Sequence, residues 1–283
     1  MPGAALRKLI RILLLCLPAG PALADATVDR MYVLECGQTR TPDVSANWSP
    51  GVDVGQARDF SDNCYLIRHG DRWLLWDTGL SDEIAAKPEG VKASNGLLTS
   101  WVRRPLQGQL AALGVQPSDV TDLAISHFHS DHAGNANLFA AAHVYLQQRE
   151  YDAAFGANPS AFGFVPALYE KLRGSTTTLL DGDYDIFGDG SAVILSTPGH
   201  TPGHQSLLVR LPQRGAVVLS GDMVHFRANW DARRVPARNF DKDASVSSME
   251  RIARLLHEQK AELWINHDRS ESDNIAHAPA AVR

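Results

Sequence analysis

Short apolar runs recur along the chain, and each of them ends at a glycine, an aspartate or a histidine. Runs of this length, rich in Val, Ile, Leu and Trp, predict buried strands. They occupy residues 73–76, 123–126, 193–196, 216–220 and 262–266. Stretches with the spacing of an amphipathic helix lie between them, at residues 105–113 and 247–256. Strands that alternate with helices predict an α/β architecture.

The first 24 residues have the layout of a secretory signal. Arg7, Lys8 and Arg11 accompany the apolar run at residues 9–17, and residues 22–24 form a small-x-small cleavage site. The apolar run is too short to span a bilayer. We therefore expect residues 1–24 to be removed and the protein to be periplasmic or secreted. Because no linker-like stretch divides the remainder, we expect residues 25–283 to form one domain.

The composition is acidic, with 27 Lys and Arg against 32 Asp and Glu, a formal charge of −5. The charge becomes −8 once residues 1–24 are removed, since they contain three basic and no acidic residues. An acidic chain without a basic run is poorly suited to nucleic acid or to anionic membranes. We expect neither as a partner.

Cys36 and Cys64 are the cysteines of the expected mature chain. Export would permit a disulfide between them. A chain of this length does not need one, however, and Cys64 lies in a strand-like run where buried free thiols are common. The sequence leaves the pairing open and slightly favours free thiols.

The strongest candidate for chemistry is the segment His127-Phe128-His129-Ser130-Asp131-His132, which follows a predicted strand. Residues two apart in an extended segment point the same way, so His127 and His129 can hold one metal ion. Asp131 and His132 lie on the turn into a helix predicted to open at residues 133–135, and they suit a second ion. Two metal ions that share one water form a hydrolytic centre.

Further candidate ligands follow the other predicted strands. His200 follows residues 193–196, Asp222 follows residues 216–220, and His267 follows residues 262–266, while Asp77 ends the strand at residues 73–76. No Gly-x-Ser-x-Gly nucleophile motif is present in the sequence. The candidate chemistry is therefore that of metal ions and not that of a serine nucleophile.

The order and spacing of these residues, from about Val28 to about Asp268, resemble the signature of the metallo-β-lactamase superfamily. The resemblance implies a four-layer αβ/βα sandwich, in which two mixed sheets face each other, helices lie outside and the metals lie at one edge. It also implies a ligand set for two ions. One ion would be held by His127, His129 and His200, and the other by Asp131, His132 and His267. Asp222 would be shared by both. Asp77 would orient a ligating histidine. Ligands of this kind suit two Zn²⁺ ions, and Fe, Co or Mn stay open.

Within the superfamily, residues 63–67, 126–135 and 197–207 are most similar to the quorum-quenching N-acyl-homoserine lactone lactonases. This resemblance implies a small-molecule lactone or ester substrate, attacked by a hydroxide that bridges the metals. Asp131 would manage the departing proton. His225 occupies a position where these lactonases commonly carry a tyrosine. It would either donate a hydrogen bond to the substrate carbonyl or indicate a different substrate. His204 would be structural.

Several alternatives stay open at this level. Another dimetal hydrolase of the fold would act on organophosphate triesters or arylesters, or least of all on β-lactams, and a non-catalytic metal-binding protein is a further alternative. Some aromatic residues in loop-like segments could form an apolar substrate wall: Trp48, Trp101, Phe162, Phe164, Phe226 and Trp230. The oligomeric state is open, with a dimer as one option.

Overall fold

The computed structural model describes residues 26–93 and 96–283. The predicted signal segment, residues 1–24, lies outside the described residues. Within those two ranges, no helix combines the length and the apolar character that are needed to cross a bilayer.

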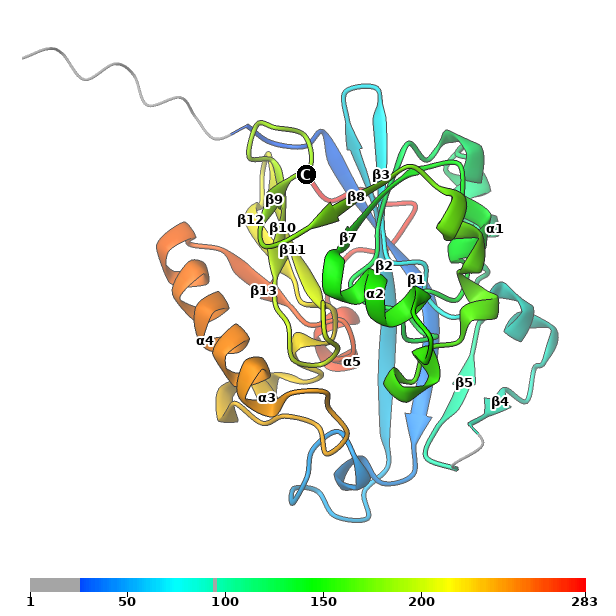
Figure 1. Ribbon diagram of the computed structural model, residues 1–283, viewed down its shortest axis with the longest axis vertical. Helices are drawn as coiled ribbons and strands as arrows, with labels where there is room; N and C mark the ends of the chain where they lie inside the picture. The colour runs from blue at the N-terminus through cyan, green and yellow to red at the C-terminus, as the bar shows by residue number, and fades with distance from the viewer. Residues whose placement is uncertain (1–25, 94–95) are drawn as a thin grey trace, which may run out of the picture.

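An eight-stranded sheet, here called the larger sheet, forms one half of the molecule (Figure 1). Its strands lie in the order β4-β5-β1-β2-β3-β6-β7-β8. Neighbouring strands are antiparallel from β4 through β5, β1 and β2 to β3, and they are parallel from β3 through β6 and β7 to β8. The bounds in chain order are β1 (Arg30–Thr41), β2 (Arg58–His69), β3 (Arg72–Trp76), β4 (Val91–Lys92), β5 (Thr99–Trp101), β6 (Asp122–Ala124), β7 (His143–Gln147) and β8 (Thr177–Leu180).

A five-stranded sheet, the smaller sheet, faces the larger one in the order β13-β12-β11-β10-β9. Strands β12 and β13 are parallel, and the other neighbours are antiparallel. The bounds are β9 (Tyr184–Asp185), β10 (Ala192–Ser196), β11 (Gln205–Leu211), β12 (Gly215–Leu219) and β13 (Glu262–Trp264). Both sheets are therefore mixed, as the resemblance implies.

Alternation along the strands divides the core into layers. In β3, Leu74 and Trp76 point into the space between the sheets, whereas Leu75 points to the outer side of the larger sheet. In β11, Val209 contributes to the space between the sheets and Leu208 to the outer side of the smaller sheet. Because successive side chains of a strand point to opposite faces, each apolar strand supplies two core layers.

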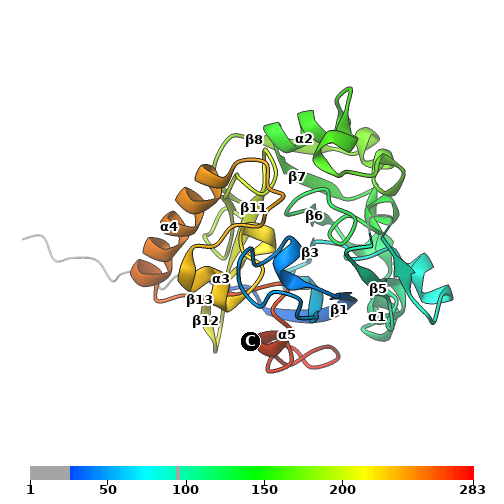
Figure 2. The same cartoon turned by 90° about the horizontal axis from the view of Figure 1, so that it is seen from below.

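Helices cover both outer faces, which completes the four layers (Figure 2). Leu106 and Leu110 of α1 and Ala153 of α2 pack on the larger sheet, whereas Met249 and Ile252 of α4 pack on the smaller one. The predicted fold class, a four-layer αβ/βα sandwich, is confirmed. The helices are α1 (Leu106–Ala112), α2 (Gln148–Phe155), α3 (Arg227–Ala232), α4 (Lys242–Gln259) and α5 (Arg269–Ser272).

The segment around the histidine motif differs from its prediction. The predicted strand 123–126 ends at Ala124, and the expected helix at residues 133–135 is a short 3₁₀ turn, Ala136–Phe139. The cause is Asn135, whose side-chain amide donates to the carbonyls of Thr78 and Leu80, each at 2.8 Å. The motif is thus tied to the neighbouring turn after β3 and does not continue into an α-helix.

The end of the chain completes one edge of the larger sheet. On one side of β1, strand β5 reaches only Gln38–Arg40. Further along that strand, Met31 and Val282 exchange backbone hydrogen bonds of 2.9 and 2.8 Å, and the Ala278 N–H donates to the carbonyl of Val33 at 2.8 Å. The C-terminal segment therefore covers backbone groups of β1 that no strand pairs.

Candidate metal centre and its pocket

The candidate ligands meet at one end of the two sheets. The segment 127–132 follows β6, and the other ligands lie in the loops after β10, β12 and β13. Loops that follow neighbouring strands share an edge, so residues far apart in sequence come together there. The ligand atoms of His127, His129, His200 and Asp222 lie within 4.8 Å of one another, as do those of Asp131, His132 and His267.

Three ring nitrogens converge in the first group. His129 Nδ1 lies 2.8 Å from His127 Nε2 and 3.0 Å from His200 Nε2. Asp222 Oδ2 lies 3.3 Å from His200 Nε2 and 3.8 Å from His127 Nε2. The three imidazoles and one carboxylate oxygen therefore surround one point, as the resemblance to the superfamily implies.

The second group lies on the other side of Asp222. Its Oδ1 lies 2.9 Å from His267 Nε2 and 3.1 Å from His132 Nε2. Asp131 Oδ2 lies 3.8 Å from His267 Nε2. Each oxygen of the Asp222 carboxylate thus faces a different group, which is the arrangement that a bridging carboxylate requires.

The hydrogen bonds of the outer ring nitrogens orient the rings so that, in their neutral form, the converging nitrogens carry no hydrogen. His129 Nε2 donates to the Phe162 carbonyl at 2.9 Å, His132 Nδ1 to Asp77 Oδ2 at 2.9 Å, and His267 Nδ1 to the Ser61 carbonyl at 2.8 Å. A neutral imidazole carries only one N–H, so the opposite nitrogen of each ring presents a lone pair.

Lone pairs that face one another at close range repel unless a cation lies between them. Within the described residues, His132 Nε2 and Asp222 Oδ1 are buried without a hydrogen-bond partner. Burial lowers the pKa of His127 and that of His200 well below the ordinary range, which favours neutral, ligating rings. The residues therefore fit metal cations.

Asp77 organises the histidine motif from the end of β3. It adopts a left-handed conformation with φ 58°, which an aspartate tolerates better than most residues. Its carboxylate accepts from the Ser126 N–H at 2.6 Å, from Ser126 Oγ at 2.9 Å and from the His132 ring. The carboxylate therefore fixes both the backbone before the motif and the orientation of His132.

His204 lies apart from both ligand groups. Its Nδ1 donates to the Thr197 carbonyl at 3.1 Å, and its Nε2 accepts from the Asp222 N–H at 2.8 Å. Both ring nitrogens are occupied by protein groups, so His204 is structural, as expected, and it positions the backbone of Asp222.

Glu150 of α2 is a buried residue at the site that the sequence did not reveal. One oxygen accepts from the Phe128 N–H at 3.2 Å, and the other accepts from Thr201 Oγ1 and from the Gly203 N–H, each at 2.8 Å. Burial raises its pKa to about 7. The carboxylate joins the loop of His127 and His129 to the loop of His200. A single glutamate in a helix has no pattern that distinguishes it from a surface residue.

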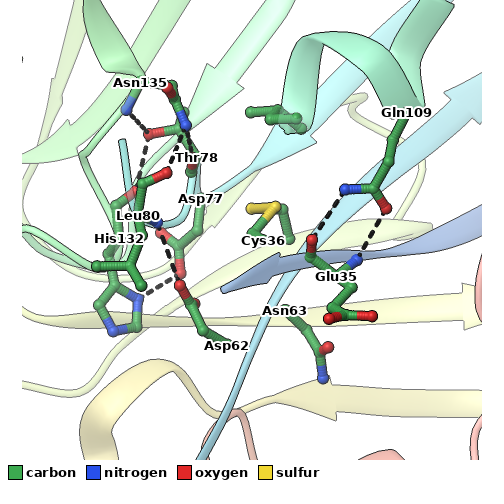
Figure 3. Close-up of a disulfide and its surroundings, with 12 residues drawn as sticks. Glu35, Cys36, Asp62, Asn63, Asp77, Thr78, Leu80, Gln109, His132 and Asn135 are labelled. Carbon is green, nitrogen blue, oxygen red and sulfur yellow. Dashed lines mark hydrogen bonds and ion pairs between the residues drawn. A yellow bond between two sulfur atoms is a disulfide. The ribbon is translucent and has the colours of Figure 1, made fainter. Parts of the chain in front are cut away.

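Cys36 and Cys64 form a disulfide, contrary to the slight preference for free thiols. The Cys36 carbonyl accepts from the Leu80 N–H at 3.2 Å, so the disulfide lies beside the turn that carries Asp77 (Figure 3). A Cβ on Gly79 would lie 2.2 Å from the Cys36 Cβ, so only glycine fits there.

A pocket of about 680 Å³ opens over the two groups of candidate metal ligands, here called the metal groups. Its floor includes His129, Asp131, His200, Asp222 and His267, and its polar wall includes Ser130 and His225. The volume lies within the range of small-molecule sites. Of the aromatic residues expected at a substrate wall, Trp48 and Phe162 line the pocket. The other four are absent from its lining: Trp101, Phe164, Phe226 and Trp230. Trp101 and Trp230 lie in β5 and α3 and not in loops. Further apolar residues, one in β2 and two in loops, complete the wall: Phe60, Leu98 and Phe240.

His225 lies at the junction of pocket and metal groups. Its Nε2 is 3.2 Å from Asp222 Oδ2, and its Nδ1 is buried without a hydrogen-bond partner among the described residues. The ring stacks on His267 with a centroid distance of 5.4 Å. It therefore offers one ring nitrogen that no described protein group occupies.

The model of the metallo-β-lactamase superfamily matches residues 57–258. The N-acyl homoserine lactonase AttM of Azorhizobium caulinodans is 30% identical to this chain over 88% of it and 97% of the relative. An N-acyl homoserine lactonase from a Bacillus species is 29% identical over 86% of this chain and 94% of the relative.

Solved structures agree with these relatives. The structure of an N-acyl homoserine lactone hydrolase with the product N-hexanoyl-L-homoserine at its catalytic metal centre superposes with a TM-score of 0.79 at 25% identity, over 90% of this chain and all of that one. A quorum-quenching N-acyl homoserine lactone lactonase gives a TM-score of 0.77 at 26% identity, over 91% of this chain and 100% of that chain. On its sequence, its fold and its convergent metal-ligand groups, the chain belongs to the metallo-β-lactamase superfamily.

Proposed function

We propose that this protein is an exported dinuclear metal hydrolase that opens the lactone ring of N-acyl-homoserine lactones. The observation that carries the proposal is the placement of Asp222, whose two oxygens face two separate ligand groups at the floor of a pocket. The similarity to N-acyl homoserine lactonases over most of both chains supports the choice of substrate.

Two metal ions fit the residues present. His127, His129 and His200 would hold one ion, Asp131, His132 and His267 the other, and Asp222 would contact both. Such ions lower the pKa of water toward neutrality and polarise an ester carbonyl. Imidazole and carboxylate ligands favour zinc. Elemental analysis of the purified protein is expected to find two transition-metal ions per chain, and a single ion after reconstitution would contradict this ligand assignment.

The protein groups beside the ions have separate roles in the proposed reaction. His225 is placed to donate a hydrogen bond from its ring to the substrate carbonyl oxygen, where negative charge develops. Asp131 has a side chain that is 30% exposed toward the pocket, and it is placed to pass the departing proton to the alcohol that forms when the ring opens. The apolar wall, with Trp48 and Phe162, would exclude water from the acyl chain.

The experiment is a comparison of substrates on the metal-loaded protein. We expect N-hexanoyl-homoserine lactone to have the highest kcat/KM in a panel that also contains an organophosphate triester, an arylester and a cephalosporin. A triester or arylester turned over faster than the lactone would assign the protein to another hydrolytic branch of the superfamily. No turnover of any substrate by protein with two bound ions would favour a binding function.

Export is the remaining part of the proposal, and it is supported by the basic and apolar layout of residues 1–24. N-terminal sequencing of protein from the periplasm or medium is expected to begin at Asp25 or within two residues of it. Recovery of protein that begins at Met1, or of a lipid-modified Cys16, would contradict this location.

A further inference from the structure

A second hollow adjoins the pocket over the metal groups. It has a volume of about 610 Å³ and lies against α2 and the loop that follows it. Ala161, Phe162 and Phe240 line both the pocket and this hollow. The two spaces are therefore neighbours that share one wall, and only the first contains the candidate metal ligands.

The shared wall is tied to the metal groups on both sides. The Phe162 carbonyl accepts from the His129 ring at 2.9 Å, and the Phe240 N–H donates to the His200 carbonyl at 3.2 Å. The two phenyl rings are neighbours, with centroids 5.9 Å apart. The position of the wall relative to the candidate ligands is consequently fixed by its hydrogen bonds to His129 and His200.

Phe240 is unusual in its exposure. Its relative exposure is 57%, although a phenyl ring is normally more stable when buried. Beyond it, Ala153, Ala157 and Pro202 continue the apolar surface of the second hollow, while charged and polar residues lie at its rim: Arg149, Asp152 and Asn158. An apolar track thus runs from the pocket, past an exposed aromatic ring, into a second space.

We propose that the second hollow is a subsite for the distal methylene groups of a long N-acyl chain. The inference rests on the proposed lactonase function, which places the lactone ring and amide beside the metal groups. A short acyl chain would end within the first pocket. A chain of ten to twelve carbons would pass Phe162 and Phe240 and cover the apolar surface around Ala157. The protein then prefers long-chain N-acyl-homoserine lactones.

Burial of each additional methylene group contributes roughly fourfold to binding. Contacts this far from the reacting bond are equal in the substrate and in the transition state, so they lower KM and leave kcat unchanged. The wild-type protein should therefore show a KM that falls from N-butanoyl- through N-octanoyl- to N-dodecanoyl-homoserine lactone.

The test fills the second hollow without changing the first. Ala157 is exposed and lines only the second hollow, so Ala157→Trp should block the subsite. We expect the ratio of kcat/KM for the dodecanoyl to the butanoyl lactone to fall roughly tenfold or more, through KM, with the metal content unchanged. Ala112→Trp is the matched control, because Ala112 is an exposed alanine of α1 outside both hollows, and it should keep the wild-type ratio.

Phe240→Ala provides a second measurement, since loss of the shared ring should lower the same ratio. A ratio that Ala157→Trp leaves unchanged, or an equal loss for all chain lengths, would overturn the subsite. Failure of the wild-type, metal-loaded protein to open any acyl-homoserine lactone would instead overturn the proposed function, so the two failures are distinct.

Discussion

Ring orientation decides what the histidines of this site can do. Each of His129, His132 and His267 donates from one ring nitrogen to a protein oxygen, which turns the lone pair of the other nitrogen toward the shared centre. The two carboxylate oxygens of Asp222 face the same centre from the opposite side. The candidate site is therefore a ligand set already oriented for cations.

The central position of Asp222 predicts an unequal effect of two substitutions. Asp222→Ala should loosen both metal ions, because each of its oxygens faces a different group, whereas His267→Ala should loosen mainly one. Metal content after dialysis against graded chelator measures both effects. An Asp222→Ala protein that keeps one ion as tightly as the wild type would contradict the bridging role.

The position of His225 in the pocket wall predicts an effect on rate without an effect on metal content. His225→Ala should lower lactone turnover by roughly ten- to a thousandfold, as loss of one oxyanion donor does. His225→Tyr should retain substantial activity, since a phenol donates to the same oxygen. Steady-state kinetics and elemental analysis on the same preparations provide the measurement. Loss of a metal ion from His225→Ala would make the histidine a ligand, in line with its position near Asp222 and His267.

At the scale of the elements, Glu150 of α2 connects two loops that carry candidate ligands. Gly203 shows how close this packing is, because a Cβ at that position would lie 2.3 Å from the Glu150 backbone nitrogen. The strand ends were predictable, since each apolar run stops next to a residue with ligand chemistry. The link through Glu150 was not, because its partners are two backbone amides and one hydroxyl from distant segments.

Glu150→Gln should loosen the ion held by His127, His129 and His200 more than the other. The glutamine amide would place its NH₂ group against backbone N–H or hydroxyl donors that now donate to the Glu150 carboxylate. Loss of such supporting contacts costs roughly ten- to a hundredfold in metal affinity. A two-step titration with a chromophoric chelator measures this, with His200→Ala and His267→Ala to identify the steps.

Tyr169→Phe is the matched control for that experiment. Tyr169 is buried against Phe128 with ring centroids 4.4 Å apart, and its hydroxyl donates to the Ala154 carbonyl at 3.1 Å. Loss of the hydroxyl group removes a hydrogen bond to α2, while the ring contact with Phe128 stays in place. Equal loosening of both ions by Glu150→Gln would indicate general destabilisation and not positioning.

At the scale of the whole molecule, the alternation of apolar strands and helices was sufficient to predict an α/β architecture, because it follows from local periodicity. The two facing sheets and the four layers were implied by the resemblance to the superfamily. The disulfide was not predictable, because it depends on register. β1 and β2 pair Leu34 with Cys64 and shift between Glu35 and Gly37, which places Cys36 within 5.8 Å of Cys64 between their Cα atoms. The pocket likewise depends on loops that meet only in the folded chain.

Replacement of Cys36 and Cys64 by alanine should lower the free energy of unfolding by about 3–4 kcal/mol. The bond closes a loop with a sequence separation of 28 residues, and its removal allows the unfolded chain more conformations. Urea unfolding of the wild type and the double variant, both metal-loaded, measures the difference. A difference below about 1 kcal/mol would mean that the bond contributes little beyond packing.

The C-terminal segment determines whether part of the β1 backbone is open to pairing with another chain. Residues 277–283 cover backbone donors and acceptors of Met31 and Val33 that lie beyond the reach of β5. An uncovered strand edge is a template for another chain. Deletion of residues 277–283 should therefore promote self-association, visible as larger species in size-exclusion chromatography. A purification tag attached after Arg283 through a flexible linker should leave the edge covered, whereas one that replaces the segment should not.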